Sequence, residues 1–196
     1  MLEEYNDLQE MIHKEMDDKR FVHTMGVAYT ASAMAMAYGE DLKKAYLAGL
    51  LHDCAKCHTN PEFITLCEEY GIPITESEYE NPFLLHGKLG AYQAKHKYNI
   101  NDEEILSAIT WHTTGKPAMT LLEKIIFIAD YIEPDRKELP NIHEIRKTAF
   151  SDIDKAMVLI SGSTIKYLED NGRSIDNITR DTYNYYLNIC KETGNI

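Results

Sequence analysis

Glycine and proline are scarce in this chain of 196 residues, which contains ten of the former and six of the latter. Both shares lie below the averages of about 7% and 5%, which excludes collagen-like and low-complexity sequences. No stretch approaches the roughly 18 consecutive apolar residues that a membrane span needs. Because 44% of the residues are hydrophobic and 27% are charged, the composition is that of a globular protein, and the shortage of helix breakers favours helices.

Positive charge is also in short supply. Lysine and arginine together number 20 against 32 acidic residues, so the net charge is −12. Such a chain repels polyanions, and we expect no nucleic-acid partner. An anionic small substrate would need local positive charge from a few basic side chains or from bound metal ions. The acidic opening segment lacks the cationic and apolar stretches of an export signal, so we expect a cytoplasmic protein without a membrane partner.

The four cysteines, with no export signal in view, are expected to be reduced thiols. Residues 54–58 read Cys-Ala-Lys-Cys-His, which fits a haem-attachment pattern and also resembles half of a redox or zinc site. Covalent haem attachment requires export, and a thioredoxin-type motif requires a βαβ context that the helical pattern denies. We therefore expect inert thiols at Cys54 and Cys57.

Apolar residues recur at helical spacing along most of the chain, and no segment alternates as a half-buried strand does. Gly39 and Gly71 are expected to end helices, and Asp41 and Asn101 to begin them. Residues 72–81 lack a period and are expected to form a loop. The sequence predicts one all-α domain, residues 1–196, a single-domain helical bundle. Its expected helices are 3–16, 20–38, 42–54, 61–70, 83–98, 102–112, 119–132, 142–148, 151–170 and 177–191.

Several histidines and aspartates stand at the edge of strongly apolar helical segments. His52 and Asp53, for example, directly follow Ala-Gly-Leu-Leu, and Asp130 follows Ile-Ile-Phe-Ile-Ala. Burying such groups unpaired would cost several kcal/mol, so they need partners. Different helices can deliver these side chains to one bundle core, as in other metal-binding bundles. The candidates are His23, His52, Asp53, His86, His112 and Asp130.

Neutral imidazole and carboxylate groups suit iron, zinc, nickel and manganese. Neighbouring helical residues point about 100° apart, so His52 can bind one ion while the two oxygens of Asp53 bridge to a second. Two ions about 3.5 to 4 Å apart can generate a hydroxide and clamp a phosphoryl group during in-line displacement. The metals would also reverse the local negative field.

The order His23, His52-Asp53, Asp130 resembles the H…HD…D pattern of HD-domain metal-dependent phosphohydrolases. His86 and His112, which lie between the HD pair and the last aspartate, resemble the extra ligands of the subgroup with two metals. Longer strings are similar to the bacterial YqeK family and fall within a motif-bearing core of about residues 20–136, on which helices within 142–191 are expected to pack. These strings span residues 20–27, 48–56, 85–91, 109–115 and 128–136.

The resemblance implies symmetrical cleavage of diadenosine tetraphosphate to two ADP, by in-line attack of a hydroxide that bridges two metal ions. The ions are divalent or trivalent transition metals, and the resemblance implies iron. One ion would be held by His23, His52, Asp53 and Asp130. The other would be held by Asp53, His86 and His112.

Basic positions of the same motifs imply how the substrate is bound. Arg20, Lys56 and Arg136 match them and suit phosphate, since arginine can grip it bidentately and lysine acts as a point charge. Thr114 and Gly115, in a turn after His112, are further candidates for a phosphate contact. The expected catalytic residues are Asp53, Asp130, Lys56 and Arg136.

Three other functions stay open at this stage. An HD phosphohydrolase could act on another nucleotide, such as a nucleotide monophosphate, a cyclic nucleotide or a guanosine polyphosphate, because no base-reading motif is evident. A mixed-valent di-iron oxygenase and a non-catalytic metal-bound sensor use similar ligand sets. The expected partner is a small-molecule nucleoside polyphosphate, and a homodimer is kept as an alternative to a monomer.

Overall fold

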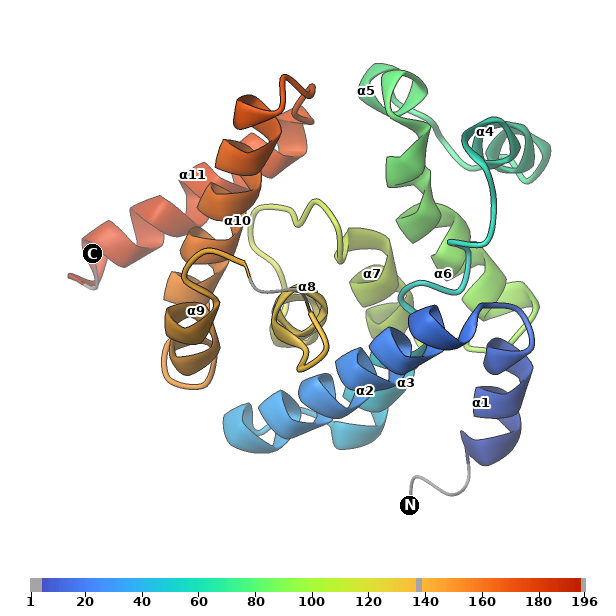
Figure 1. Cartoon of the computed structure of the whole chain (residues 1–196), viewed down its shortest axis with the longest axis horizontal. Helices are drawn as coiled ribbons and strands as arrows, with labels where there is room; N and C mark the ends of the chain where they lie inside the picture. Colours follow the sequence, from blue (N-terminus) through green and yellow to red (C-terminus); the bar gives the residue numbers. More distant parts are fainter. Residues whose placement is uncertain (1–4, 137–138, 195–196) are drawn as a thin grey trace.

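The computed structural model describes residues 5–136 and 139–194, and within these ranges every regular element is a helix (Figure 1). The all-α fold class predicted from the sequence is confirmed. None of the described helices is both long and apolar enough to cross a membrane. The elements are α1 (Asn6–His13), α2 (Asp18–Tyr38), α3 (Leu42–Leu51), α4 (Asn60–Glu69), α5 (Glu76–Glu80), the 3₁₀ helix η2 (Pro82–Leu85), α6 (His86–His96), α7 (Glu103–Trp111), α8 (Leu121–Ile132), α9 (Ile142–Ala149), α10 (Ile153–Asp170) and α11 (Asn177–Glu192).

Side-chain caps set most of the helix starts. The Asp17 carboxylate, which was not predicted as a cap, accepts the Arg20 N–H at α2. Asp41, the predicted cap, accepts the Lys44 N–H at α3. At α7 the cap is Asp102 rather than the predicted Asn101. Gly39 ends α2 with φ of 75°, a left-handed conformation that glycine adopts without strain.

Two local departures from the predicted elements have identifiable causes. The expected loop 72–81 contains the short helix α5, which begins with a capping box between Thr75 and Glu78. The expected helix 83–98 starts as η2 and becomes α-helical only at His86, because Pro82 opens a separate tight turn. This break places His86 in the first turn of α6.

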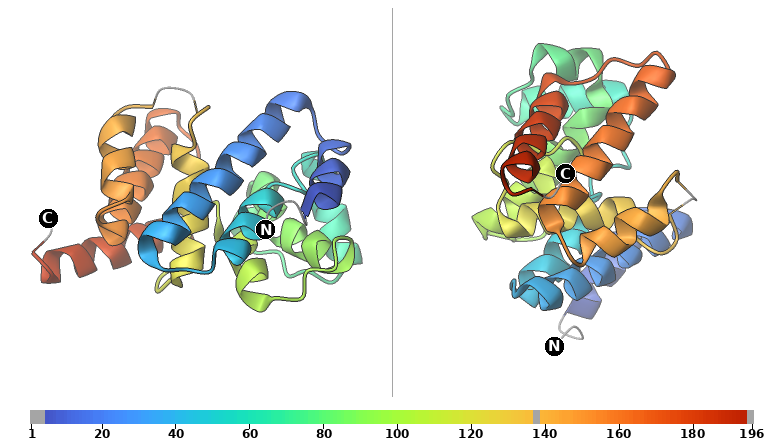
Figure 2. Two further views of the ribbon diagram at one scale, coloured as in Figure 1. Left: turned by 90° about the horizontal axis from the view of Figure 1, so that it is seen from below. Right: turned by 90° about the vertical axis from the view of Figure 1, so that its left-hand side faces the viewer.

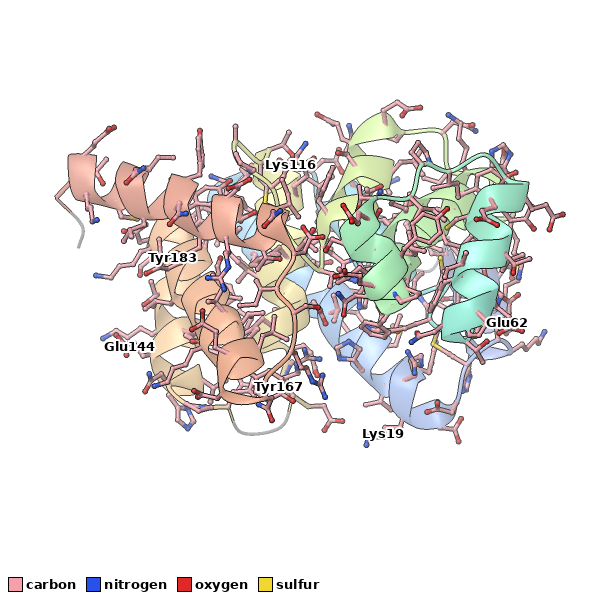
Figure 3. The ribbon with its side chains drawn as sticks, turned by 90° about the horizontal axis from the view of Figure 1, so that it is seen from above. Lys19, Glu62, Lys116, Glu144, Tyr167 and Tyr183 are labelled. Atoms are coloured by element: carbon pink, nitrogen blue, oxygen red, sulfur yellow. The ribbon has the colours of Figure 1, made fainter. Side chains whose placement is uncertain are left out.

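Helix α8 lies at the centre of the fold and contacts α2, α3, α7 and α10. Helices α4–α7 lie on one side of it and α9–α11 on the other, as Figure 1 and the left view of Figure 2 show. Figure 3 shows the same division, with Tyr167 and Tyr183 of α10 and α11 on one side and Glu62 of α4 on the other. Seven apolar residues of α8 are buried: Leu122, Ile125, Ile126, Phe127, Ile128, Ala129 and Ile132.

Two glycines allow helices to approach closely beside the histidines. A Cβ atom on Gly49 would lie 2.8 Å from the Ala28 backbone, so α3 could not pack as tightly on α2. A Cβ atom on Gly87 would lie 2.5 Å from the Thr110 carbonyl oxygen, where α6 meets α7. These contacts hold α3 against α2 and the start of α6 against the end of α7.

Candidate metal centre

The six histidines and aspartates singled out in the sequence converge on one buried site. They come from five helices, three of which contribute a residue at or just beyond an end. His23 lies in the first half of α2, and Asp130 lies near the C-terminal end of α8. The other four are His52 and Asp53 directly after α3, His86 at the start of α6 and His112 directly after α7, and each is at most 2% exposed.

The two carboxylate oxygens of Asp53 face different sets of imidazoles. Oδ2 lies 3.4 Å from Nε2 of His52 and 3.9 Å from Nε2 of His23. Oδ1 lies 3.4 Å from Nε2 of His112 and 3.6 Å from Nε2 of His86. The central carboxylate therefore separates the cluster into two groups of nitrogen atoms.

Asp130 belongs to the first of these groups. Its Oδ1 atom lies 3.1 Å from Nε2 of His23 and 3.8 Å from Nε2 of His52. In the second group, the Nε2 atoms of His86 and His112 are 3.0 Å apart. All four imidazoles thus present Nε2 to the interior of the cluster.

Three buried atoms of the cluster have no hydrogen-bond partner in the described chain. They are Nε2 of His52, Oδ1 of Asp53 and Oδ1 of Asp130. Leaving such atoms unsatisfied costs about 1–3 kcal/mol each, more for charged groups, so a ligand is needed to offset the cost. Imidazole nitrogens and carboxylate oxygens that all point inward fit first-row transition-metal ions. Two overlapping groups have their donor atoms close enough together to hold an ion, one of His23, His52 and Asp130 and one of His52, Asp53 and His112.

The protonation states also suit metal binding. Burial, together with the neighbouring charges of His112 and Lys56, lowers the pKa of His86 to about 3, so its imidazole is neutral at pH 7. Burial raises the pKa of Asp53, but the positive charges of His52 and Lys56 outweigh it and hold the pKa well below its usual range. The aspartate is therefore ionised, as a metal ligand must be.

His23 is pulled in the opposite direction. Burial lowers its pKa, but the negative charge of Asp130 and the hydrogen bond to Glu133 outweigh that effect, so the pKa lies above its ordinary value of 6.5. The excess negative charge around His23 favours a cation at this end of the cluster.

Two of the predicted phosphate-binding residues border the cluster. Lys56 Nζ lies 2.8 Å from Asp53 Oδ2, and Arg136 Nη1 lies 3.7 Å from Asp130 Oδ1. Both side chains retain exposure to solvent, at 18% and 36%. Arg20 is half-buried and lies one helical turn before His23 on α2. Positive charge is therefore available beside the acidic ligands.

Thr114 and Gly115 lie in the turn after His112. The Thr114 hydroxyl donates to the Gly115 carbonyl oxygen at 3.0 Å. Gly115 is buried, and a Cβ atom there would lie 2.7 Å from the Thr182 methyl group of α11. These contacts are local or structural, and a phosphate-binding role for either residue stays a prediction.

Two residues that contact the cluster were not predicted from the sequence. The Thr113 hydroxyl lies 3.0 Å from Nε2 of His86 and 3.1 Å from Nε2 of His112. The Glu133 carboxylate lies 3.0 Å from Nδ1 of His23. Thr113 could have been suspected because it directly follows His112. Glu133 could have been suspected because it lies one helical turn after Asp130.

The cysteine motif has no part in the cluster's chemistry. All four cysteines are free thiols. Cys54 is buried, and burial raises the pKa of its thiol, so it remains neutral and unreactive at pH 7. Cys57 is exposed, and burial of part of its side chain raises the pKa of that thiol as well. The expectation of inert thiols agrees with these environments.

Comparison with known proteins places this geometry in a family. The model of the HD domain matches residues 20–135, which include all six clustered residues. Two symmetrical bis(5'-nucleosyl)-tetraphosphatases are similar over most of their length. The protein of Bacillus subtilis is 36% identical over 90% of this chain and 94% of its own, and that of Halalkalibacterium halodurans is 39% identical over 91% and 94%.

A solved structure shares the fold. The crystal structure of an HD superfamily hydrolase described as involved in NAD metabolism, from Clostridium acetobutylicum, superposes with a TM-score of 0.91 at 41% identity. The match covers 94% of this chain and 97% of that one. The chain therefore belongs to the HD-domain hydrolases, and within them to the YqeK family that its motifs resemble.

Proposed function

We propose that this HD-domain hydrolase cleaves diadenosine tetraphosphate symmetrically to two ADP at a dinuclear metal centre. The observation that carries the proposal is the division of the cluster by Asp53, whose Oδ2 faces His23 and His52 while Oδ1 faces His86 and His112. The names of the relatives from B. subtilis and H. halodurans support the choice of substrate.

The proposed ligand sets follow the two sides of Asp53. When bound, the two ions would lower the pKa of a shared water molecule and neutralise charge on the phosphoryl oxygens. We assign iron on the strength of the family resemblance, because the donor set itself also suits zinc, nickel and manganese. The first set is His23, His52, Asp53 and Asp130, and the second is Asp53, His86 and His112.

The chain's own residues complete the chemistry around these ligands. Asp53 and Asp130 remain ionised, so their carboxylates can hold both ions beside the phosphoryl group that reacts. Lys56 and Arg136 border the same carboxylates and donate hydrogen bonds to the equatorial oxygens as negative charge develops. Arg20, Thr114 and Gly115 are proposed to contact the outer phosphates.

Product analysis in isotopically labelled water tests the reaction. We expect hydrolysis of diadenosine tetraphosphate in H₂¹⁸O to give ADP as the only nucleotide. One of each two ADP molecules would carry a single ¹⁸O on its β-phosphate, because water attacks one side of the central anhydride. Formation of AMP and ATP would contradict symmetrical cleavage. Turnover without oxygen would exclude the oxygenase alternative, and a lack of hydrolysis across a nucleotide panel with metal loaded would favour a sensor.

Elemental analysis of protein purified without chelator tests the metal. We expect iron at about two atoms per chain. A centre filled by zinc or manganese that supports the same turnover would contradict the assignment of iron. A single domain over residues 1–196, a cytoplasmic location and the absence of a nucleic-acid partner stay predictions.

A further inference from the structure

The four imidazoles of the cluster differ in the hydrogen-bond partner of Nδ1, the ring nitrogen that points away from the cluster. In three of them Nδ1 donates to the backbone carbonyl oxygen three residues earlier. His23 is the exception, since its Nδ1 lies 3.0 Å from Oε1 of Glu133. The three backbone contacts are His52 to Gly49 at 2.7 Å, His86 to Phe83 at 2.5 Å and His112 to Ile109 at 2.7 Å.

These contacts decide which nitrogen carries the proton. A carbonyl oxygen only accepts hydrogen bonds, so Nδ1 of His52, His86 and His112 must carry the hydrogen, which leaves the lone pair on Nε2 free for a ligand. His23 lies in the middle of a continuous helix and has no such carbonyl contact in the described chain. The Glu133 carboxylate, at the end of α8, supplies an acceptor for its Nδ1 instead.

Hydrogen bonds hold Glu133 at both of its carboxylate oxygens and at its backbone carbonyl oxygen. Only 1% of it is exposed, and its Oε2 accepts the backbone N–H of Asp135 at 2.7 Å. Arg146 of α9 donates from Nε to the Ile132 carbonyl oxygen at 2.9 Å and from Nη2 to that of Glu133 at 2.7 Å. Arg146 of α9 therefore holds the backbone at Glu133, and the Asp135 N–H holds its carboxylate.

Gly26 leaves room for this carboxylate against α2. It lies one helical turn after His23, and a Cβ atom at this position would come within 2.6 Å of Glu133 Oε2. Glycine inside a helix costs about 1 kcal/mol relative to alanine. The space it leaves is filled by the carboxylate that contacts His23, which gives the glycine a role in the cluster.

We propose that Glu133 is a positioning residue for His23, which keeps the proton on Nδ1 and directs the Nε2 lone pair toward the first ion. The inference rests on the proposed metal centre and adds a residue outside its ligand set. A carboxylate behind a histidine ligand orients the ring and makes it a stronger donor, and losing such a partner lowers metal affinity about 10- to 100-fold. Gly26 supports this role by keeping α2 clear of the carboxylate.

Stepwise titration of metal-free protein with Mn²⁺ tests the inference without any nucleotide. In Glu133→Leu we expect the affinity for one ion to fall about 10- to 100-fold, while the affinity for the ion held by His86 and His112 is unchanged. Glu133→Gln keeps an oxygen that can accept from His23 Nδ1, and we expect it to restore part of the loss. Gly26→Ala should weaken the same ion, although it removes no polar group.

Two matched variants control for general effects on folding. Gly162→Ala changes another helical glycine, on α10, and Glu144→Gln neutralises an exposed glutamate on α9. Both should bind two ions as the wild type does. Because Gly26→Ala and Glu133→Gln are milder than Glu133→Leu, they keep the test valid if the leucine variant does not fold.

The outcomes separate this inference from the proposed reaction. Unchanged affinity for both ions in folded Glu133→Leu and Gly26→Ala, or an equal loss at both, would overturn the positioning role. Failure of the wild type to bind any ion would overturn it as well. If the wild type binds two ions but hydrolyses no diadenosine tetraphosphate, the proposed function fails while the Mn²⁺ titrations still decide the role of Glu133.

Discussion

The ammonium nitrogen of Lys56 lies 2.8 Å from Oδ2 of Asp53, the oxygen that also faces the imidazoles of His23 and His52. A cation bound by those imidazoles would compete with Lys56 for this oxygen. The three N–H donors of the lysine would then be available to an incoming phosphate. We therefore expect the lysine to change partners when metal and substrate bind.

Replacing Lys56 by methionine should separate substrate binding from metal binding. We expect kcat/KM for diadenosine tetraphosphate to fall about 10- to 100-fold, because a hydrogen bond to a charged group contributes about 1.5–3 kcal/mol. The metal content, measured by elemental analysis, should stay at the wild-type level. Lys95→Met is the control, since Lys95 pairs with Glu103 at the surface. Unchanged kinetics in Lys56→Met would argue against a phosphate contact.

His86→Ala should remove one ion and leave the other. Its Nε2 lies near Oδ1 of Asp53, on the side away from His23 and His52. We therefore expect about one tightly bound ion per chain by elemental analysis, together with loss of hydrolysis. The exposed His143 of α9 provides the control, and His143→Ala should retain both ions. Retention of two tightly bound ions in His86→Ala would contradict the second ligand set.

Removing metal with a chelator should lower the thermal stability of the protein. An ion present at 100 times its Kd stabilises the folded state by about 2.7 kcal/mol. For a chain of this size each kcal/mol shifts Tm by about 2–4 °C, so we expect a drop of roughly 5–10 °C for each ion removed, measured by calorimetry. His86→Ala should show a smaller drop than the wild type. Equal Tm values with and without chelator would mean that the cluster binds no metal in the folded protein.

Glu123 should make stability depend on pH away from the metal centre. Burial raises the pKa of this carboxyl, but hydrogen bonds from Lys116, Ser107 and the Thr120 N–H outweigh it, so the pKa lies below its ordinary value of 4.5. A depressed folded-state pKa means that the stabilisation is complete above about pH 4.5 and is lost as the pH falls through the folded value.

The variant Glu123→Gln tests this dependence. We expect it to lower the free energy of unfolding by about 1–3 kcal/mol at pH 7, because Lys116 loses its charged partner. The difference from wild type should shrink below about pH 4.5, as measured by urea unfolding of the metal-free proteins at both pH values. Glu103→Gln at the surface should show little effect at either. A difference that is independent of pH would refute the role of ionised Glu123.

The helices follow from local signals in the sequence, and most of their ends do as well. Apolar periodicity locates each long helix, while side chains such as Asp41 and residues such as Gly39 mark the boundaries. The missed helix α5 is only one turn long, so its capping box at Thr75 carries no periodic pattern with it. The outward position of Val22, which is 51% exposed, depends on which neighbours pack against α2 and is not encoded locally.

Part of the site could be predicted because polar residues stand directly after strongly apolar segments. Asp53 and Asp130 follow apolar segments where an unpaired acid would be costly, and that conflict identifies them. Glu133 follows the same segment but stands beside Pro134 and Asp135, where an acidic residue at a helix end is unremarkable. Its contact with His23 joins two helices far apart in the sequence, so only the packing of α2 against α8 reveals it.

Anomalous diffraction from crystals grown with Mn²⁺ tests whether Asp53 bridges two ions. We expect two peaks about 3.5–4 Å apart, each bonded to a different oxygen of Asp53. The first peak should also contact His23, His52 and Asp130, and the second His86 and His112. A single peak, or two peaks that do not share Asp53, would show that Asp53 does not bridge a pair of ions.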